Sequence, residues 1–427
     1  MICDRERKTK VEFHQGCVMM APGARRRSRR SGRYGTIEVL GPEHEFSIVD
    51  EHLHPLPIVD QIIKRLCGRI KNNVAMSGYA LGKELQAHVA ELKAEKPFAS
   101  PRIFEETMHR AVLEISEAVE GFGAMLLGLG MHPTLRLNEA EVWSHRDRKI
   151  YDAFDGIFGL RQHGWLNIQS FQLNLPYLNE DEAVRLYNTV ASVLPYLPAV
   201  SASSPIYESR FGEYVDNRLH FYRINQERIP SITGDIAPKP IDSFETYLNL
   251  TIRRYSTDLE AAGAPDYMLN REWINSRGAI FRFDRRALEI RIMDEQECIK
   301  SDVALSCFIR SLLRGLMRGE ETVPPHPLLV KDLQAVIRDG LNARVSHASS
   351  STARGVCRHF YKVAHDNSSE EERGYLEVIK KRIEGGNLSD LISDRVRRRA
   401  QRTDLEEAIL SVYLTLAEKL KRNEIYG

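Results

Sequence analysis

Polar and apolar side chains alternate one by one over several short segments of this chain, which is typical of strands with one buried face. In the segment 43–49, Glu43, Glu45 and Ser47 alternate with Phe46 and Ile48. Two carboxylates on one strand face repel each other unless solvent or a cation lies between them. Similar patterns predict further strands at 36–40, 84–92, 166–175, 278–283 and 288–293.

Other segments repeat their apolar residues every three or four positions, which indicates helices. One helix is expected after the N-cap Ser100, with Pro101 in its first turn. Its apolar face comprises Phe104, Met108, Ala111, Ile115, Val119 and Phe122. A second helix is expected from Asn179 toward Leu194, and helices follow Asp302 almost to the chain end. This order predicts an α+β fold, an antiparallel sheet cradle with helices packed on its outer face.

The polar faces of the predicted strands concentrate residues that bind metals and phosphates. The set comprises Glu43, Glu45, Glu84, Glu91, Gln172, Asn174, Arg282, Glu289 and Arg291. Each strand alone is better explained by a solvated face or a surface salt bridge. Together they predict a cradle for polyphosphate and divalent metal, because hard cations prefer carboxylate oxygen and arginine stabilises transferring phosphoryl oxygens.

One pair resists simple alternation. Glu84 and Glu91 are seven residues apart, which would place them on opposite faces of a single strand. Both reach one site only if Glu84 precedes the strand or a bulge intervenes.

Composition and charge set the class of protein. The chain has 427 residues, of which 42% are hydrophobic and 28% charged, values typical of a globular protein. No apolar stretch approaches the ~20 residues of a membrane helix. The six cysteines form no CxxC pair, so we expect reduced thiols in a cytoplasmic protein.

The net charge of +1 is unevenly distributed. Residues 1–35 carry +7 and the remainder −6, with six arginines between Arg25 and Arg33. We interpret 1–33 as a disordered, solvated basic leader, or as sequence upstream of a later start, rather than as a nucleic-acid contact. The expected domains are this leader, a catalytic domain at 34–320, and a helical region at 321–427 that completes the same domain.

Considered in order, the motifs resemble the glutamate–cysteine ligase and carboxylate–amine ligase families, which are related in fold to glutamine synthetase. The segment 41–46 (GPEHEF) resembles the Glu-x-Glu of their first strand, and Glu84 and Glu91 match an acidic pair of the same spacing. The segments 195–205 (PYLPAVSASSP), 217–221 and 288–291 resemble three later motifs in the same order.

This resemblance implies an ATP-dependent ligase that forms an amide, by default between the γ-carboxylate of glutamate and cysteine. The implied ligands of two or three Mg²⁺ or Mn²⁺ ions are Glu43, Glu45, Glu84, Glu91 and Glu289. The residues implied to contact substrate, phosphate or nucleotide are Arg218, Arg291, Gln172, Asn174 and Arg282. The implied partners are small-molecule substrates. From composition and charge we expect neither a membrane nor a nucleic acid as a partner, and a homo-oligomer is left open.

One departure motivates a rival interpretation. Many members of these families carry a His-x-His pair where this chain has Ser170 and Gln172, although Gln172 and Asn174 resemble the plant-type ligases. The rival is a catalytically idle relative that binds a nucleotide or a partner.

Zinc binding was considered for three histidines near the first strand. His52 and His54 lie in an expected loop without a nearby cysteine, and His44 lies within the strand. We expect the loop histidines to be solvated, because zinc sites show closer His/Cys spacing.

Overall fold

The computed structural model describes residues 34–319 and 323–427, so the predicted leader at 1–33 lies outside the described residues. Eight strands form one sheet in the order β2-β3-β4-β1-β6-β10-β9, and β5 also pairs with β1. Every pairing in this sheet is antiparallel, as predicted. The strands are β1 (Gly41–Val49), β2 (Asn73–Ala75), β3 (Tyr79–Lys83), β4 (Val89–Ala94), β5 (Met125–Leu127), β6 (Ser170–Pro176), β9 (Ala279–Arg282) and β10 (Ala287–Asp294).

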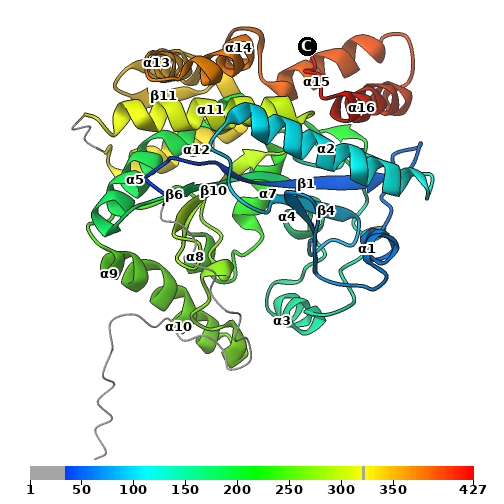
Figure 1. Cartoon of the computed structure of the whole chain (residues 1–427), viewed down its shortest axis with the longest axis horizontal. Helices are drawn as coiled ribbons and strands as arrows, with labels where there is room; N and C mark the ends of the chain where they lie inside the picture. Colours follow the sequence, from blue (N-terminus) through cyan, green and yellow to red (C-terminus); the bar gives the residue numbers. More distant parts are fainter. Residues whose placement is uncertain (1–33, 320–322) are drawn as a thin grey trace, which may run out of the picture. The chain divides into compact units, whose positions relative to one another are not determined.

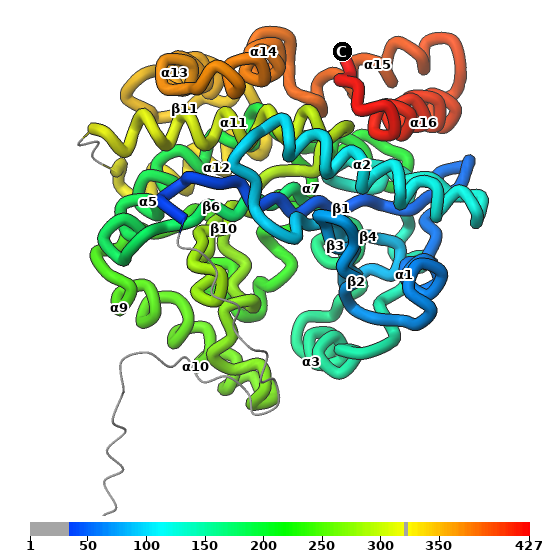
Figure 2. The backbone as a smooth tube through the Cα atoms, viewed as in Figure 1, coloured from blue at the N-terminus to red at the C-terminus, as the bar shows by residue number. Residues whose placement is uncertain are grey.

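Two long helices, α2 (Pro101–Glu120) and α11 (Ile299–Leu316), lie over one face of the sheet, and further helices cover them in turn (Figure 1). The tube in Figure 2 shows α13 and α14 beyond α11, on the side away from β1. The C-terminal helices are α12 (His326–Asp339), α13 (Ala353–Asp366), α14 (Glu370–Gly385), α15 (Leu388–Arg399) and α16 (Leu405–Arg422). Of these, α13 and α14 contact α11, and α16 contacts α2. The α+β prediction with helices on the outer face is confirmed.

The remaining elements form the connections between the strands. They are α1 (Val59–Cys67), α3 (Arg148–Phe158), α4 (His163–Leu166), α5 (Glu180–Val193), α6 (Pro198–Ser201), α7 (Asn217–Ile224), α8 (Pro230–Thr233), α9 (Phe244–Tyr247), a π-helical turn (Leu248–Arg253), α10 (Arg254–Ala261) and the 3₁₀ turns Leu194–Tyr196, Asp266–Met268, Glu272–Ile274 and Gly340–Asn342. Among these elements, α5 contacts α11 on the helix-covered side of the sheet. Two small hairpins complete the described chain, β7 (Ile206–Tyr207) with β8 (Arg210–Phe211) and β11 (Arg344–His347) with β12 (Ser350–Thr352).

N-cap residues explain why α2 and α5 begin where the sequence predicted. Ser100 caps α2, with its hydroxyl accepting a hydrogen bond from the amide of Ile103. Asn179 caps α5 in the same way, accepting from the amide of Glu182. Each cap satisfies a backbone N–H that the helix itself leaves without a partner.

One predicted strand is wrong, and another is correct only in its second half, which belongs to β4. Residues 36–39 form a turn instead of a strand, and Ile37 has a φ of 55°. The segment 84–92 is not one strand, because residues 84–88 connect β3 to β4 in a hairpin. Apolar residues in a tight connection, here Leu85 and Ala87, imitate strand alternation over a few positions.

Three smaller boundaries also differ from the prediction. Strand β6 begins at Ser170, since residues 163–166 form α4. Phe122 lies beyond the end of α2 and is exposed, so it does not belong to the apolar face of that helix. The C-terminal region contains the β11–β12 hairpin in addition to helices.

Residues 34–427 pack as one unit, with α11 contacting both α13 and α14 of the C-terminal region. The four cysteines of the described residues, Cys67, Cys298, Cys307 and Cys357, are free thiols. Among the described helices, none has the length and apolar content that crossing a membrane would require.

Candidate functional site

Cross-strand pairing gathers the acidic residues on the sheet face opposite α2 and α11. Glu45 of β1 stands directly opposite Glu91 of β4, and Glu43 stands opposite Gln172 of β6. Glu289 of β10 is in turn opposite Asn174 of β6. Directly opposed residues of an antiparallel pair share one face, so these side chains line a continuous polar strip across four strands.

The hairpin resolves the seven-residue spacing of Glu84 and Glu91. Glu84 directly follows β3 and Glu91 lies within β4, so one strand does not have to carry both residues. Gly82 is paired with Glu91 in the register of the hairpin. A Cβ atom on residue 82 would overlap Oε2 of Glu91, so the absence of a side chain makes room for that carboxylate.

Three hydrogen bonds hold the Glu45 carboxylate from β6. Its Oε2 accepts from the Ser170 amide at 2.7 Å, and its Oε1 accepts from the Ser170 hydroxyl at 3.1 Å and the Gln172 amide at 2.9 Å. The two residues that replace a His-x-His pair therefore orient Glu45, which is itself 92% buried.

Arginines face the other two carboxylates of the strip. Arg285, in the turn between β9 and β10, pairs with Glu43, which also accepts a hydrogen bond from Asn174 at 3.1 Å. Glu289 is fully buried between Arg282 at 2.7 Å and Arg291 at 3.4 Å. These guanidinium groups balance the charge of the strip at its β9–β10 end.

The remaining three carboxylates are less well neutralised. Burial raises the pKa of Glu45 to about 7, and the charge of Glu91 adds to this effect. Burial likewise raises the pKa of Glu84 to about 7, with a further contribution from Glu45. Burial raises the pKa of Glu91 to about 8; Lys93 opposes the rise, whereas Glu84 increases it.

Glu43 behaves in the opposite way. Burial favours its neutral form, but Arg285 and Lys93 outweigh burial and lower the pKa of Glu43 to about 2.

A cavity of about 480 Å³ opens beside this strip. Glu45, Glu84, Arg218 and Arg291 line it together with Ser170 and Gln172. Its remaining walls are largely aromatic or apolar and come from α3, α4, α7 and the segment 273–276, including Tyr151, Phe154, Trp165, Tyr222 and Trp273. The cavity is large enough for small-molecule substrates, with a charged floor and an aromatic wall.

Arg218, at the start of α7, connects the cavity to a bulge in β10. The register of β10 against β6 shifts between Ile290 and Met293. The Arg218 guanidinium donates to the carbonyl oxygens of Arg291 and Ile292 at 2.9 and 3.2 Å, and pairs with Asp294 at 3.2 Å. It therefore satisfies backbone groups at the bulge, a feature common beside active sites.

The segment 195–205 forms hydrogen bonds to Asp294, the last residue of β10. Oδ2 of Asp294 accepts hydrogen bonds from the Ser203 amide at 2.8 Å and the Ser204 hydroxyl at 2.7 Å. The motif recognised in the sequence thus fixes the carboxylate that pairs with Arg218.

Sequence reasoning missed three cationic residues of the site: Lys83, Lys93 and Arg285. Lys93 pairs with Glu91, and Lys83 contacts the Tyr151 hydroxyl at the cavity wall. The sequence did contain a signal for Lys93: it lies two residues after Glu91 in β4, so both side chains point to the same face of the sheet. The sequence contained no such signal for Arg285, because it lies in the turn between β9 and β10.

The donor set of the strip fits divalent cations such as Mg²⁺. Carboxylates from three strands and one connection converge with amide oxygens, the hard donors that this ion prefers. Within the described residues, Oδ1 of Asn174 and Oε1 of Glu289 are buried and accept no hydrogen bond, which leaves acceptor capacity on this face.

His52 and His54 are exposed in the loop after β1, and His54 pairs with Asp50 at 2.9 Å. The prediction that these loop histidines are solvated is confirmed. His44 is different, since its side chain is fully buried on the opposite face of β1.

Comparison with known proteins identifies related chains. The model of the family described as glutamate–cysteine ligase family 2 matches residues 39–412. An uncharacterized protein of Archaeoglobus fulgidus is 46% identical over 388 residues, covering 91% of this chain and all of that protein. A Rubrobacter xylanophilus protein named "Putative glutamate--cysteine ligase 2-1" is 24% identical, covering 82% of this chain and 88% of that protein.

Two solved structures share the fold at low sequence identity. A glutamate–cysteine ligase of Francisella tularensis, solved in complex with AMP, has a TM-score of 0.62 at 12% identity, covering 91% of this chain and 90% of that one. A bifunctional glutathione synthetase of Pasteurella multocida has a TM-score of 0.56 at 13% identity, covering 89% of this chain and 51% of that one.

Proposed function

This chain belongs to the glutamate–cysteine ligase family 2, and we propose that it is an ATP-dependent ligase that joins the γ-carboxylate of glutamate to an amine. The observation that carries this proposal is the convergence of Glu43, Glu45, Glu84, Glu91 and Glu289 beside a cavity that Arg218 and Arg291 also line. Polyphosphate chemistry requires this combination of metal-binding carboxylates and phosphoryl-binding arginine.

The proposed reaction has two steps. An oxygen of the glutamate γ-carboxylate attacks the γ-phosphorus of ATP, so the β,γ-bridging P–O bond breaks and ADP leaves. The amine then attacks the resulting acyl phosphate, the acyl C–O bond to phosphate breaks, and inorganic phosphate leaves with an amide formed. Activation is necessary because a free carboxylate has no adequate leaving group for an amine.

The five glutamates would hold Mg²⁺ or Mn²⁺, and these ions would neutralise the phosphate oxygens during transfer. Ser170 and Gln172 hold the Glu45 carboxylate in one orientation. Arg291 lines the cavity and its Nη1 is held by the carbonyl oxygen of Asn275 at 2.8 Å. We assign Arg291 to the transferred phosphoryl group or the acceptor carboxylate, either of which a guanidinium binds well.

Arg218 has a supporting position in this proposal. Its side chain is 98% buried and three of its contacts hold β10, so it acts mainly by fixing the strand that carries Glu289 and Arg291. Gln172, Asn174 and Arg282 act in the same way, because each contacts one of the five glutamates.

The test is a ligation assay with a panel of amines, cysteine included. The purified protein is incubated with ATP, Mg²⁺, glutamate and each amine, and ADP, phosphate and the amide product are quantified. With glutamate labelled by ¹⁸O in its γ-carboxylate, one ¹⁸O is expected in each phosphate released. Phosphate without the label would reject the acyl-phosphate route.

A specific observation supports the rival, a nucleotide-binding relative without turnover. Glu43 and Glu289 already have arginine partners, which compete with metal for the same oxygens. If no amine or acid elicits phosphate release while ATP still binds in equilibrium dialysis, the rival replaces the ligase proposal.

A further inference from the structure

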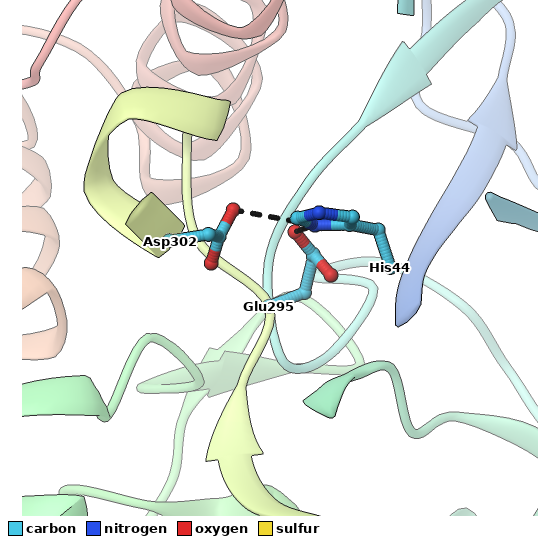
Figure 3. A group of neighbouring side chains, drawn as sticks. All are labelled: His44, Glu295 and Asp302. Atoms are coloured by element: carbon cyan, nitrogen blue, oxygen red, sulfur yellow. Dashed lines mark hydrogen bonds and ion pairs between the residues drawn. The ribbon is translucent and has the colours of Figure 1, made fainter. Parts of the chain in front are cut away.

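A second group of ionisable side chains lies on the opposite face of the sheet from the glutamate strip. His44 of β1, Glu295 immediately after β10, and Asp302 in the first turn of α11 converge there (Figure 3). All three side chains are fully buried. Residues far apart in the sequence thus bring one imidazole and two carboxylates together, on the face of β1 opposite Glu43 and Glu45.

The spacing of the three groups matches the ligands of a metal ion. Nδ1 of His44 lies 3.2 Å from Oε1 of Glu295 and 3.5 Å from Oδ2 of Asp302. The contact with Glu295 is a hydrogen bond, but it is longer than the ~2.7–2.9 Å that is usual for charge-assisted hydrogen bonds. Ligands held about 2.1 Å from a tetrahedral ion stand about 3.4 Å apart, which agrees with both distances.

The hydrogen-bond inventory points the same way. Within the described residues, the carboxylate oxygens of the fully buried Asp302 accept no hydrogen bond, and Oδ2 forms a 3.5 Å ion pair with Nδ1 of His44, which Figure 3 shows as a dashed line. A buried carboxylate without hydrogen bonds carries a large desolvation cost. A bound cation would remove this cost.

The surroundings hold the candidate ligands in place. Oε2 of Glu295 accepts a hydrogen bond from the backbone amide of Glu45 at 3.1 Å, which fixes the carboxylate against β1. The His44 ring packs against Phe46, Phe104 and Phe171 at centroid distances of 5.0–5.9 Å. These rings hold the imidazole in place. Its burial opposes a charged imidazolium, but Glu295 and Asp302 outweigh burial and raise the pKa of His44 to about 9, so a metal bound through Nδ1 would displace a proton.

We propose that His44, Glu295 and Asp302 bind a divalent transition-metal ion of the Zn²⁺ type, which ties β1 to the end of β10 and the start of α11. The imidazole selects against Mg²⁺, which takes oxygen ligands, and in favour of Zn²⁺, which takes nitrogen and oxygen together. This site is separate from the glutamate strip, because neighbouring residues of a strand point to opposite faces.

The test uses the full-length protein, produced with added Zn²⁺ and purified in Mg²⁺ buffer. Elemental analysis is expected to find about one transition-metal equivalent per chain in the wild type. Asp302→Asn is expected to lose it, since an amide is a weaker ligand of similar shape. Asp332→Asn, at a buried aspartate that hydrogen-bonds Tyr196 and Ser346, is the matched control and should retain the metal.

Glu289→Gln separates this site from the proposed active site. It should retain the transition metal, whereas loss of the metal in this variant would place the ion on the glutamate strip and overturn the proposal. A failure of the ligase assay leaves this result unaffected, because the readout is metal content.

X-ray absorption at the zinc edge of the wild type decides the question even if Asp302→Asn does not fold. Only nitrogen and oxygen ligands at about 2.0–2.2 Å are expected, with one imidazole. A sulfur ligand at about 2.3 Å would assign the metal to cysteine. A wild type that holds no metal would show that the three side chains form an ion pair only.

Discussion

Single residues set the charge balance at the proposed active site. Glu289 is fully buried and contacts Arg282 and Arg291 together. Its pairing register with Asn174 fixes its position on the strip.

Replacing Glu289 by Gln should abolish turnover while leaving the fold intact. The variant keeps the shape of the side chain but removes the charge that would bind metal, so turnover in the ligation assay should fall by at least about 100-fold. Glu117→Gln on the exposed side of α2 is the control and should retain full activity. Unchanged turnover of Glu289→Gln would remove this residue from the proposed metal site.

Replacing Gly82 by Ala tests whether the position of Glu91 matters. The new Cβ would overlap Oε2 of Glu91 and displace the end of a flexible side chain, with little cost to the backbone. We expect the Mg²⁺ concentration for half-maximal activity to rise about 10-fold or more, with a melting temperature close to that of the wild type. Gly374→Ala in α14, which meets no atom within 4 Å, should change neither quantity.

At the scale of elements, the β10 bulge and the start of α7 form one unit. Arg218 contacts two backbone carbonyls of the bulge and the Asp294 carboxylate, and all of these groups are buried. The bulge displaces β10 from regular pairing at Arg291, so the conformation of this proposed substrate-binding residue depends on a helix far away in sequence.

Arg218→Met is expected to lower the free energy of unfolding by about 3–5 kcal/mol, because it leaves the buried Asp294 carboxylate without its cation. Urea denaturation measures this loss. Adding Asp294→Asn should restore part of it, whereas Arg102→Met, with a 67% exposed side chain, should change little. If the free energy of unfolding of Arg218→Met lies within about 1 kcal/mol of the wild-type value, Arg218 does not stabilise the bulge as described.

At the scale of the whole molecule, the C-terminal helices are attached to the sheet through α11. Glu372 of α14 is fully buried between Arg310 at 2.6 Å and Arg314 at 2.9 Å, both from α11. Burial opposes ionisation of Glu372, but the two arginines outweigh it and lower the pKa of Glu372 from 4.5 to about 2.

This shift predicts how stability depends on pH. A carboxyl with a lowered native pKa stabilises the fold above its unfolded value, and the contribution is lost as pH falls from about 4.5 through about 2. We expect Glu372→Gln to be less stable than the wild type by about 2 kcal/mol at pH 6, allowing for the partial exposure of Arg314. The difference should shrink steadily toward pH 3; a difference that stayed constant would contradict the assigned pKa.

The sequence by itself determined which side chains share a strand face and how the chain divides into strands and helices. Alternation placed Glu43 and Glu45 opposite Phe46, and the order of elements gave an α+β fold with an antiparallel sheet, because both features depend on neighbours only a few residues away. The same local rule failed at 84–92, where a short turn imitates a continuous strand.

Only the tertiary structure decided which of these faces meet. The pairing of Glu45 with Glu91 and of Glu43 with Arg285, and the meeting of His44 with Glu295 and Asp302, join residues separated by tens to hundreds of positions. No short-range pattern encodes such contacts, because they result from strand order and helix packing across the whole core. The charge balance at both sites is therefore a property of the folded chain.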